Sequence, residues 1–165
     1  VEGLVGSEMC IETVLIAASK THVINWTWAR HETTAAYTEL LRPIAAPLVA
    51  VTDGGQGAQS AIHHCWPTTR IQRCLVHAQR TVRRHTTSNP RTDAGKTIYR
   101  LALKLTGITD LDHATEWVTH LHEFSHTYRV WMNEKTTIRD PASGAYSRVY
   151  THQRVRAAYQ SLLSL

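Results

Sequence analysis

The apolar positions in the first part of the chain recur with the short period of β-strands. Residues 10–18 form an apolar, β-branched run that predicts a strand, and residues 22–30 predict a second one. In this second run two sets of side chains alternate, as in a half-buried strand: Val23, Asn25 and Thr27 against Ile24, Trp26 and Trp28. Because only Ser19-Lys20-Thr21 separates the runs, we expect a hairpin.

Helical composition and prolines then predict an alternation of helices and short strands. One helical segment stops before Pro43, and Pro67 closes a second. The apolar run between them is short enough to be a buried strand. The expected order is a helix over 34–41, a strand over 48–52, a helix over 57–65, a strand over 71–74 and a helix over 76–84.

From residue 93 onward the pattern predicts helices only. We expect helices over 93–107, 111–134 and 151–163, with a loop at Asp140-Pro141 and Ser143-Gly144. The longest of them carries a single apolar stripe: Ala114, Trp117, Leu121, Phe124, Tyr128 and Met132. The sequence therefore predicts an α/β fold in which strands and helices alternate over residues 1–92 and helices alone fill residues 93–165.

Composition narrows the class of protein only modestly. The chain has 165 residues, 42% of them hydrophobic, which is enough for a domain with a sizeable core. No apolar run approaches the roughly 20 residues that span a bilayer, so we expect no membrane association. A net charge of +5 favours an acidic partner. Three cysteines, an odd number, indicate a reducing cytoplasm rather than a disulfide framework.

The strongest candidate for chemistry is Asp53, which follows the apolar run 48–51 and precedes Gly54 and Gly55. One interpretation is a metal ligand at the carboxyl end of a strand, where α/β sheets tend to bind ligands. An equally open one is an acid that caps the following helix. A dinucleotide-binding loop is disfavoured, because Ser60 stands where its third glycine belongs and Asp53 would repel the phosphates.

Four arginines follow Asp53 in the sequence and predict a basic surface: Arg73, Arg80, Arg83 and Arg84. A solvated helix face is the default interpretation of such charges. A carboxylate for a cation beside arginines for a polyanion is nevertheless what metal-dependent chemistry on nucleic acid needs. We therefore predict that these arginines bind the phosphates of a nucleic acid.

Two strings have the spacing of zinc ligands. Cys74 and His77 lack an evident fourth ligand, so a buried cysteine and a hydrogen-bonded histidine remain the commoner interpretation. The string His122-Glu123-Phe124-Ser125-His126 matches the H-E-x-x-H of zinc proteases. The apolar stripe of its helix turns both histidines toward water, so a zinc hydrolase at His122 and His126 is the least favoured alternative.

Three blocks together resemble the DDE transposases of bacterial insertion sequences, in the mutator-like superfamily: Glu2-Gly3, Asp53-Gly54-Gly55 and the RCLVH of residues 73–77. The resemblance covers nearly the whole chain. It implies a ribonuclease-H-like mixed sheet with an α-helical insertion, and DNA cleavage and joining that use Mg²⁺ or Mn²⁺ held by three acids. It also implies element ends and target DNA as partners, a possible homo-oligomer, and a place at the nucleoid in the bacterial cytoplasm.

Matched position by position, the resemblance makes Asp53 the second catalytic acid and metal ligand, and Cys74 and His77 the Cys-x-x-His pair of the superfamily. Glu2 stands where the first Asp is expected. Residues 1–92 would be a partial catalytic core and residues 93–165 an incomplete insertion. The third acid has no counterpart, since the remaining candidates lie inside the insertion: Glu116, Glu123 and Glu134. We therefore expect a partial transposase domain with little activity alone, or a DNA-binding remnant without catalysis.

Overall fold

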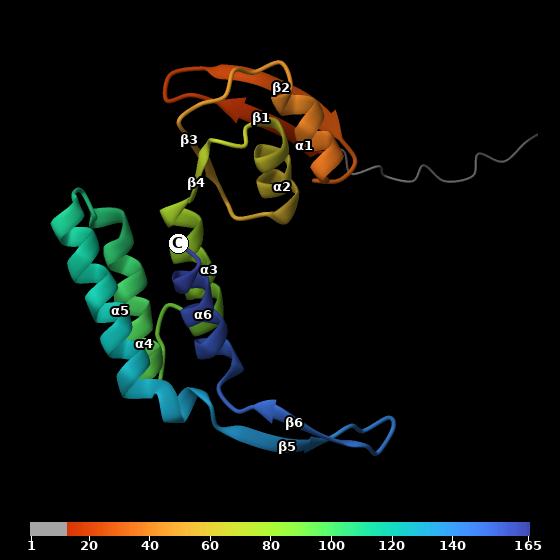
Figure 1. Cartoon of the computed structure of the whole chain (residues 1–165). Helices are drawn as coiled ribbons and strands as arrows, with labels where there is room; N and C mark the ends of the chain where they lie inside the picture. Colours follow the sequence, from red (N-terminus) through yellow and green to blue (C-terminus); the bar gives the residue numbers. More distant parts are fainter. Residues whose placement is uncertain (1–12) are drawn as a thin grey trace, which may run out of the picture. The chain divides into compact units, whose positions relative to one another are not determined.

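The computed structural model describes residues 13–165, an α/β arrangement of helices and two-stranded sheets (Figure 1). The chain divides into two units, one ending at Gln72 and one running from Arg73 to Leu165. This division precedes the change of sequence pattern at residue 93, because the helix that follows Arg73 packs against the helices after it. The assignment of residues 1–92 to a core and 93–165 to an insertion stays a prediction.

The first unit begins with the predicted hairpin. Strands β1 (Thr13–Ala18) and β2 (Val23–Ala29) pair antiparallel, with Leu15 opposite Thr27. The Ser19 hydroxyl accepts hydrogen bonds from the amides of Thr21 and His22, both at 3.2 Å, and so closes the turn. The period of two is confirmed.

The inner face of this hairpin is the more polar of the two. Asn25 and Thr27 are half-buried, and Asn25 Nδ2 donates to the Leu40 carbonyl at 2.8 Å, which satisfies its amide. Trp26 and Trp28 point outward, with exposed fractions of 54% and 60%. The helices of this unit therefore cover one face of the hairpin, and the aromatic face is open in the described chain.

Two helices and a second strand pair complete this unit. Helix α1 (Thr34–Leu41) begins at Thr33, whose hydroxyl accepts from the Ala36 amide at 3.3 Å, and it packs against α2 (Gln56–Cys65). Strands β3 (Val49–Thr52) and β4 (Arg70–Arg73) pair with each other. The shared core is small and apolar: Leu15, Leu40, Leu41, Ala61, Ile62 and Trp66.

Residues 48–51 were predicted to form a buried strand, and the prediction is wrong about the burial of this strand. Val49 and Val51 are exposed by 51% and 65%, whereas Ala50 and Thr52 are half-buried. The reason is that β3 pairs only with β4 among the described residues, so that packing covers a single face of the pair.

The second unit is built on four α-helices and a 3₁₀ turn. The predicted apolar stripe of the longest helix is confirmed, since Trp117, Leu121, Phe124 and Met132 are buried. None of the helices in residues 13–165 combines the length and the apolar character needed to cross a bilayer. The elements are α3 (Leu75–Thr86), α4 (Asp93–Lys104), η1 (Leu105–Gly107), α5 (Leu111–Met132) and α6 (Gln153–Leu163).

The prediction of helices alone after residue 93 is wrong. Strands β5 (Lys135–Arg139) and β6 (Tyr146–Tyr150) form an antiparallel hairpin between α5 and α6 (Figure 1). The expected loop at 140–144 is its turn, in which Asp140 Oδ1 accepts from the amides of Ala142 and Ser143. Threonine, isoleucine, valine and tyrosine have the shapes that favour strands on either side of such a turn.

Helix α6 also closes the C-terminal end of α3. Arg154 Nε donates to the His85 carbonyl at 2.7 Å, and Arg154 Nη2 donates to the Arg84 carbonyl at 3.0 Å. Carbonyls in the last turn of a helix have no partner within the helix, and a cation there also opposes the helix dipole. Burial, and then the charges of Arg84 and Arg154, hold the pKa of His85 below its ordinary value of 6.5.

Replacement of Gly57 tests the packing of α2. A Cβ at this position would lie 2.5 Å from the Glu32 carbonyl oxygen and 3.2 Å from the Thr33 carbonyl carbon, both backbone atoms. We expect Gly57→Ala to lower the free energy of unfolding by about 2 kcal/mol, in spite of the better helix propensity of alanine. Gly107→Ala is the control, because nothing lies within 4 Å of a Cβ there. Urea unfolding followed by tryptophan fluorescence makes the comparison, and equal losses would contradict the backbone contact.

The Arg154 contact predicts a pH effect. The pKa of His85 is lower in the folded state, so below pH 6.5 the unfolded chain binds more protons than the folded chain does. The folded state therefore loses stability as the pH falls through this range. We expect Arg154→Gln to raise the pKa of His85, measured by NMR titration, and to weaken this pH dependence. Arg91→Gln removes the same charge from an exposed side chain and serves as the control. An unchanged pKa of His85 in Arg154→Gln would contradict the contact.

Candidate active site

Asp53 lies directly after β3, in a turn that fixes one of its oxygens. The Gly55 amide donates to Asp53 Oδ1 at 2.9 Å, and the Gly54 amide donates to Thr52 Oγ1 at 3.1 Å. Gly54 has a φ of +98°, which glycine adopts without strain. The side chain is exposed, and its second oxygen accepts no hydrogen bond from residues 13–165. The carboxylate thus agrees with both interpretations. One oxygen accepts a hydrogen bond in the turn before α2, and the other is open to solvent.

A close backbone approach brings another acid toward this turn. Gly57, in the first turn of α2, lies against the backbone of Glu32 and Thr33. The Tyr37 hydroxyl donates to Glu32 Oε2 at 3.4 Å. Burial first, and then the negative charges of Glu32 and Asp53, raise the pKa of Tyr37 above 10.0. Tyr37 therefore lies within the field of both carboxylates.

The sequence analysis missed Glu32 and Tyr37. One signal was present, because Glu32 follows a predicted strand just as Asp53 follows another. Its significance was hidden, because Glu32 meets α2 through the backbone contact at Gly57 rather than through any local spacing.

The donor set of the described residues does not make a magnesium site by itself. Asp53 offers the hard carboxylate oxygen that Mg²⁺ prefers. Nowhere in residues 13–165 do three or more side chains of histidine, cysteine, aspartate or glutamate gather as a metal site requires. The predicted partner Glu2 lies outside the described residues. Asp53 thus fits as one ligand of such an ion.

Cys74 and His77 lie at the start of α3. Cys74 is the half-buried N-cap residue, and His77 is exposed in the first turn. Residues three apart lie on the same side of a helix, so the spacing turns both side chains in a similar direction. Cys65, the nearest other cysteine in the sequence, is engaged elsewhere, since its Sγ contacts the Thr38 carbonyl at 3.9 Å. In residues 13–165 this pair has no third metal-binding neighbour.

Three of the four predicted DNA-binding arginines share one face of α3. Arg80, Arg83 and Arg84 are exposed, opposite the buried Ala78 and Val82. Within residues 13–165 no carboxylate forms an ion pair with any of the three. Their charges are therefore open to solvent, as a phosphate-binding face requires.

Arg73, the fourth arginine, makes a structural contact. Its Nη1 donates to the Ser161 carbonyl at 2.9 Å and also contacts the Ser164 hydroxyl, in the last turn of α6. Asp53 and the α3 arginines belong to different units. The predicted closeness of acid and arginines therefore stays a prediction.

The H-E-x-x-H string lies as the helical pattern predicted. His122 and His126 are exposed on α5, whereas Leu121 and Phe124 are buried in the core. No third ligand joins the two histidines among residues 13–165. The two histidines therefore do not have, in this part of the chain, the third protein ligand that a catalytic zinc site requires.

A comparison with protein families identifies the chain. The family model for transposases of the Mutator family matches residues 3–140, more than four fifths of the sequence. The matched stretch contains Asp53, the Cys74–His77 pair and the arginine face of α3, and it ends at the turn of the β5–β6 hairpin. No curated protein and no solved structure matches significantly. The chain belongs to the Mutator family of transposases.

Proposed function

We propose that this chain is part of a transposase catalytic domain that cleaves DNA strands and transfers them with the help of a divalent metal. The observation that carries the proposal is the exposed carboxylate of Asp53 at the end of β3, within the stretch that matches the family. A strand-end acid open to solvent is where α/β proteins hold a ligand that must meet a large substrate.

Each predicted residue has a role in this proposal. Asp53 and Glu2 are the metal ligands, and Arg80, Arg83 and Arg84 neutralise DNA phosphates. The hydrogen bond from the Gly55 amide orients the Asp53 carboxylate and leaves its second oxygen for the ion. A bound Mg²⁺ or Mn²⁺ would supply charge neutralisation and activation of water for attack on a phosphodiester. We propose that Cys74 and His77 are the Cys-x-x-His pair of the superfamily, and we assign them no chemical step.

The proposed fold is a ribonuclease-H-like sheet interrupted by an insertion. The β1–β2 hairpin, the β3–β4 pair and the helices packed on one side support the sheet part. Helices α4 to α6, together with the β5–β6 hairpin, are the proposed insertion over residues 93–165. DNA is the proposed partner, and a homo-oligomer remains part of the proposal.

We propose that catalysis by this polypeptide alone is weak. Glu2 carries one more methylene than the expected aspartate, and a misplacement of about 1 Å at a reacting centre can cost about a hundredfold in rate. Of the remaining glutamates, Glu134 is engaged with His152, whose Nε2 lies 3.0 Å from its Oε2. Glu116 and Glu123 are exposed on α5, within the proposed insertion.

A DNA-binding remnant without catalysis is the second candidate function. It is favoured by the arginine face of α3, which forms no ion pair with the described residues 13–165 and needs no metal to bind phosphate. Both candidates predict DNA binding, and they differ in whether Asp53 holds a metal.

The first experiment measures metal binding at Asp53. We expect Mn²⁺ to broaden the amide NMR signals of Gly54 and Gly55 in the wild type and to leave them sharp in Asp53→Asn. Asparagine can accept the same hydrogen bond from Gly55, so this variant removes only the charge. Asp140→Asn is the matched control, because Asp140 is also an exposed acid that accepts amide hydrogen bonds in a turn. Equal broadening at the Asp140 turn would show general carboxylate affinity and contradict a site at Asp53.

The second experiment separates catalysis from binding. We expect the chain to bind duplex DNA with an affinity that falls steeply as salt rises, by about 0.9 in the log–log slope for each phosphate contact. The triple variant Arg80→Gln, Arg83→Gln, Arg84→Gln should lower this slope by about 2 to 3. Slow nicking of supercoiled plasmid that requires Mg²⁺ or Mn²⁺ and is lost in Asp53→Asn supports the catalytic proposal. Binding with no metal-dependent nicking supports the remnant instead.

A further inference from the structure

The β5–β6 hairpin has two faces of different chemistry. In an antiparallel pair, residues opposite each other share a face, and faces alternate along each strand. The register pairs Lys135 with Tyr150, Thr137 with Arg148 and Arg139 with Tyr146 on one face, which we call the basic face. The other face, which we call the uncharged face, carries Thr136, Ile138, Ser147 and Val149.

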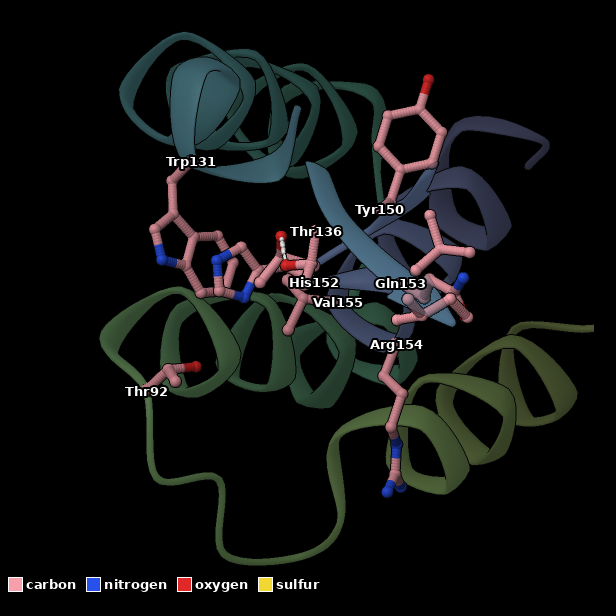
Figure 2. A pocket seen from close by; sticks show the side chains of 11 residues that line it. Thr92, Trp131, Thr136, Tyr150, His152, Gln153, Arg154 and Val155 are labelled. Carbon is pink, nitrogen blue, oxygen red and sulfur yellow. Dashed lines mark hydrogen bonds between the residues drawn. The ribbon is translucent and has the colours of Figure 1, made fainter. Parts of the chain in front are cut away.

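The uncharged face borders the rest of its unit. Thr136, Ile138 and Val149 line an open groove of about 580 Å³, to which α5 and α6 also contribute (Figure 2). Trp131 and His152 are stacked there, with ring centroids 3.5 Å apart. Tyr150 of the basic face also lines this groove, and Figure 2 shows its ring pointing away from the stacked pair.

The base of the hairpin is held from both sides. His152 Nε2 lies 3.0 Å from Glu134 Oε2, and the Thr151 amide donates to the Glu134 carbonyl at 2.9 Å. Arg156 Nη1 donates to Asn133 Oδ1 at 2.8 Å, and its guanidinium carbon lies 4.0 Å from the centre of the Tyr150 ring. These contacts fix the ribbon before any partner arrives, which lowers the entropic cost of binding.

The cations of the basic face are available to a partner. Lys135, Arg139 and Arg148 are all exposed, and no carboxylate of residues 13–165 forms an ion pair with them. The nearby acid of the turn, Asp140, is occupied by the amides of Ala142 and Ser143. Tyr146 at the far end is 74% exposed. The face thus combines uncompensated positive charge with an open aromatic ring.

We propose that the basic face of the β5–β6 hairpin is a DNA-binding surface that contacts the phosphates of a duplex. Residues on one face of a strand recur about every 7 Å, so the ribbon presents Lys135, Arg148 and Arg139 as a row of cations to the charged backbone of a duplex. A two-stranded ribbon also fits the major groove. The choice of DNA over another polyanion rests on the proposed function, and the surface is distinct from the arginine face of α3.

The test compares two triple variants of equal charge in the 165-residue chain. The first is Lys135→Thr, Arg139→Thr, Arg148→Thr, because threonine favours strands. The second is Lys96→Gln, Arg100→Gln, Lys104→Gln, which removes three cations from α4 in the same unit. Fluorescence anisotropy with a labelled duplex, measured over a range of salt, gives affinity and slope. We expect the hairpin triple to bind at least about tenfold more weakly and to lower the slope by about 2 to 3, with little change in the α4 triple.

A single variant guards against misfolding of the triple. The Arg148 side chain donates no hydrogen bond within residues 13–165, so Arg148→Thr removes charge and leaves the backbone pairing with Thr137 in place. It should lower the salt slope by about 1. Equal losses in the hairpin and α4 triples would show that only net charge matters and would overturn the proposal. A loss seen with single-stranded DNA but absent with the duplex would also overturn it.

Failure of this inference can be told apart from failure of the proposed function. If the wild type binds DNA and the hairpin variants bind equally well, the hairpin is not a contact surface, and the roles proposed for Asp53 and α3 are unaffected. If the wild type binds no duplex at any salt concentration, the proposed function and the hairpin surface fall together. Metal binding at Asp53 is measured without DNA, so it tests the proposed function and not the hairpin surface.

Discussion

The contact on which the candidate site depends is the approach of the α2 backbone to the end of β2 at Gly57. No side chain fits there, because the Glu32 carbonyl oxygen would lie 2.5 Å from a Cβ. This approach sets where α2 begins, and the turn that leads into α2 holds the Asp53 carboxylate through the Gly55 amide. The same contact lies beside Glu32, which accepts a hydrogen bond from Tyr37, and after burial the charges of Glu32 and Asp53 raise the pKa of Tyr37. A backbone constraint thus helps to position the turn that holds Asp53.

The basic residues of the second unit divide into two kinds. Some stabilise the fold: Arg73 contacts the end of α6, Arg154 closes the end of α3, and Arg156 binds Asn133. Others form no ion pair within residues 13–165, among them the cations on the arginine face of α3 and on the basic face of the hairpin. Net charge alone does not distinguish the kinds.

Elements with an apolar face could be predicted from the sequence, and those without one could not. The helix at Thr34–Leu41 and the stripe of α5 were predicted because their period reflects burial. The strand Lys135–Arg139 is exposed throughout, so no pattern of burial marks it, and its strand form depends on pairing with β6. Glu32 could not be assigned to the site for a related reason, since its place near Asp53 comes from a tertiary contact. Burial of β3 was predicted wrongly because an apolar run does not reveal how many neighbours a strand has.

The family match ends at residue 140, yet the structure shows that the following residues belong to the same folded unit. Val155, Ala158 and Leu162 of α6 are buried in the core that Ala78 and Val82 of α3 also form. Without α6, the α3 helix would lose that apolar contact and the Arg154 contacts at its C-terminal end. The arginine face of α3 lies within the family match, but its support comes from beyond it.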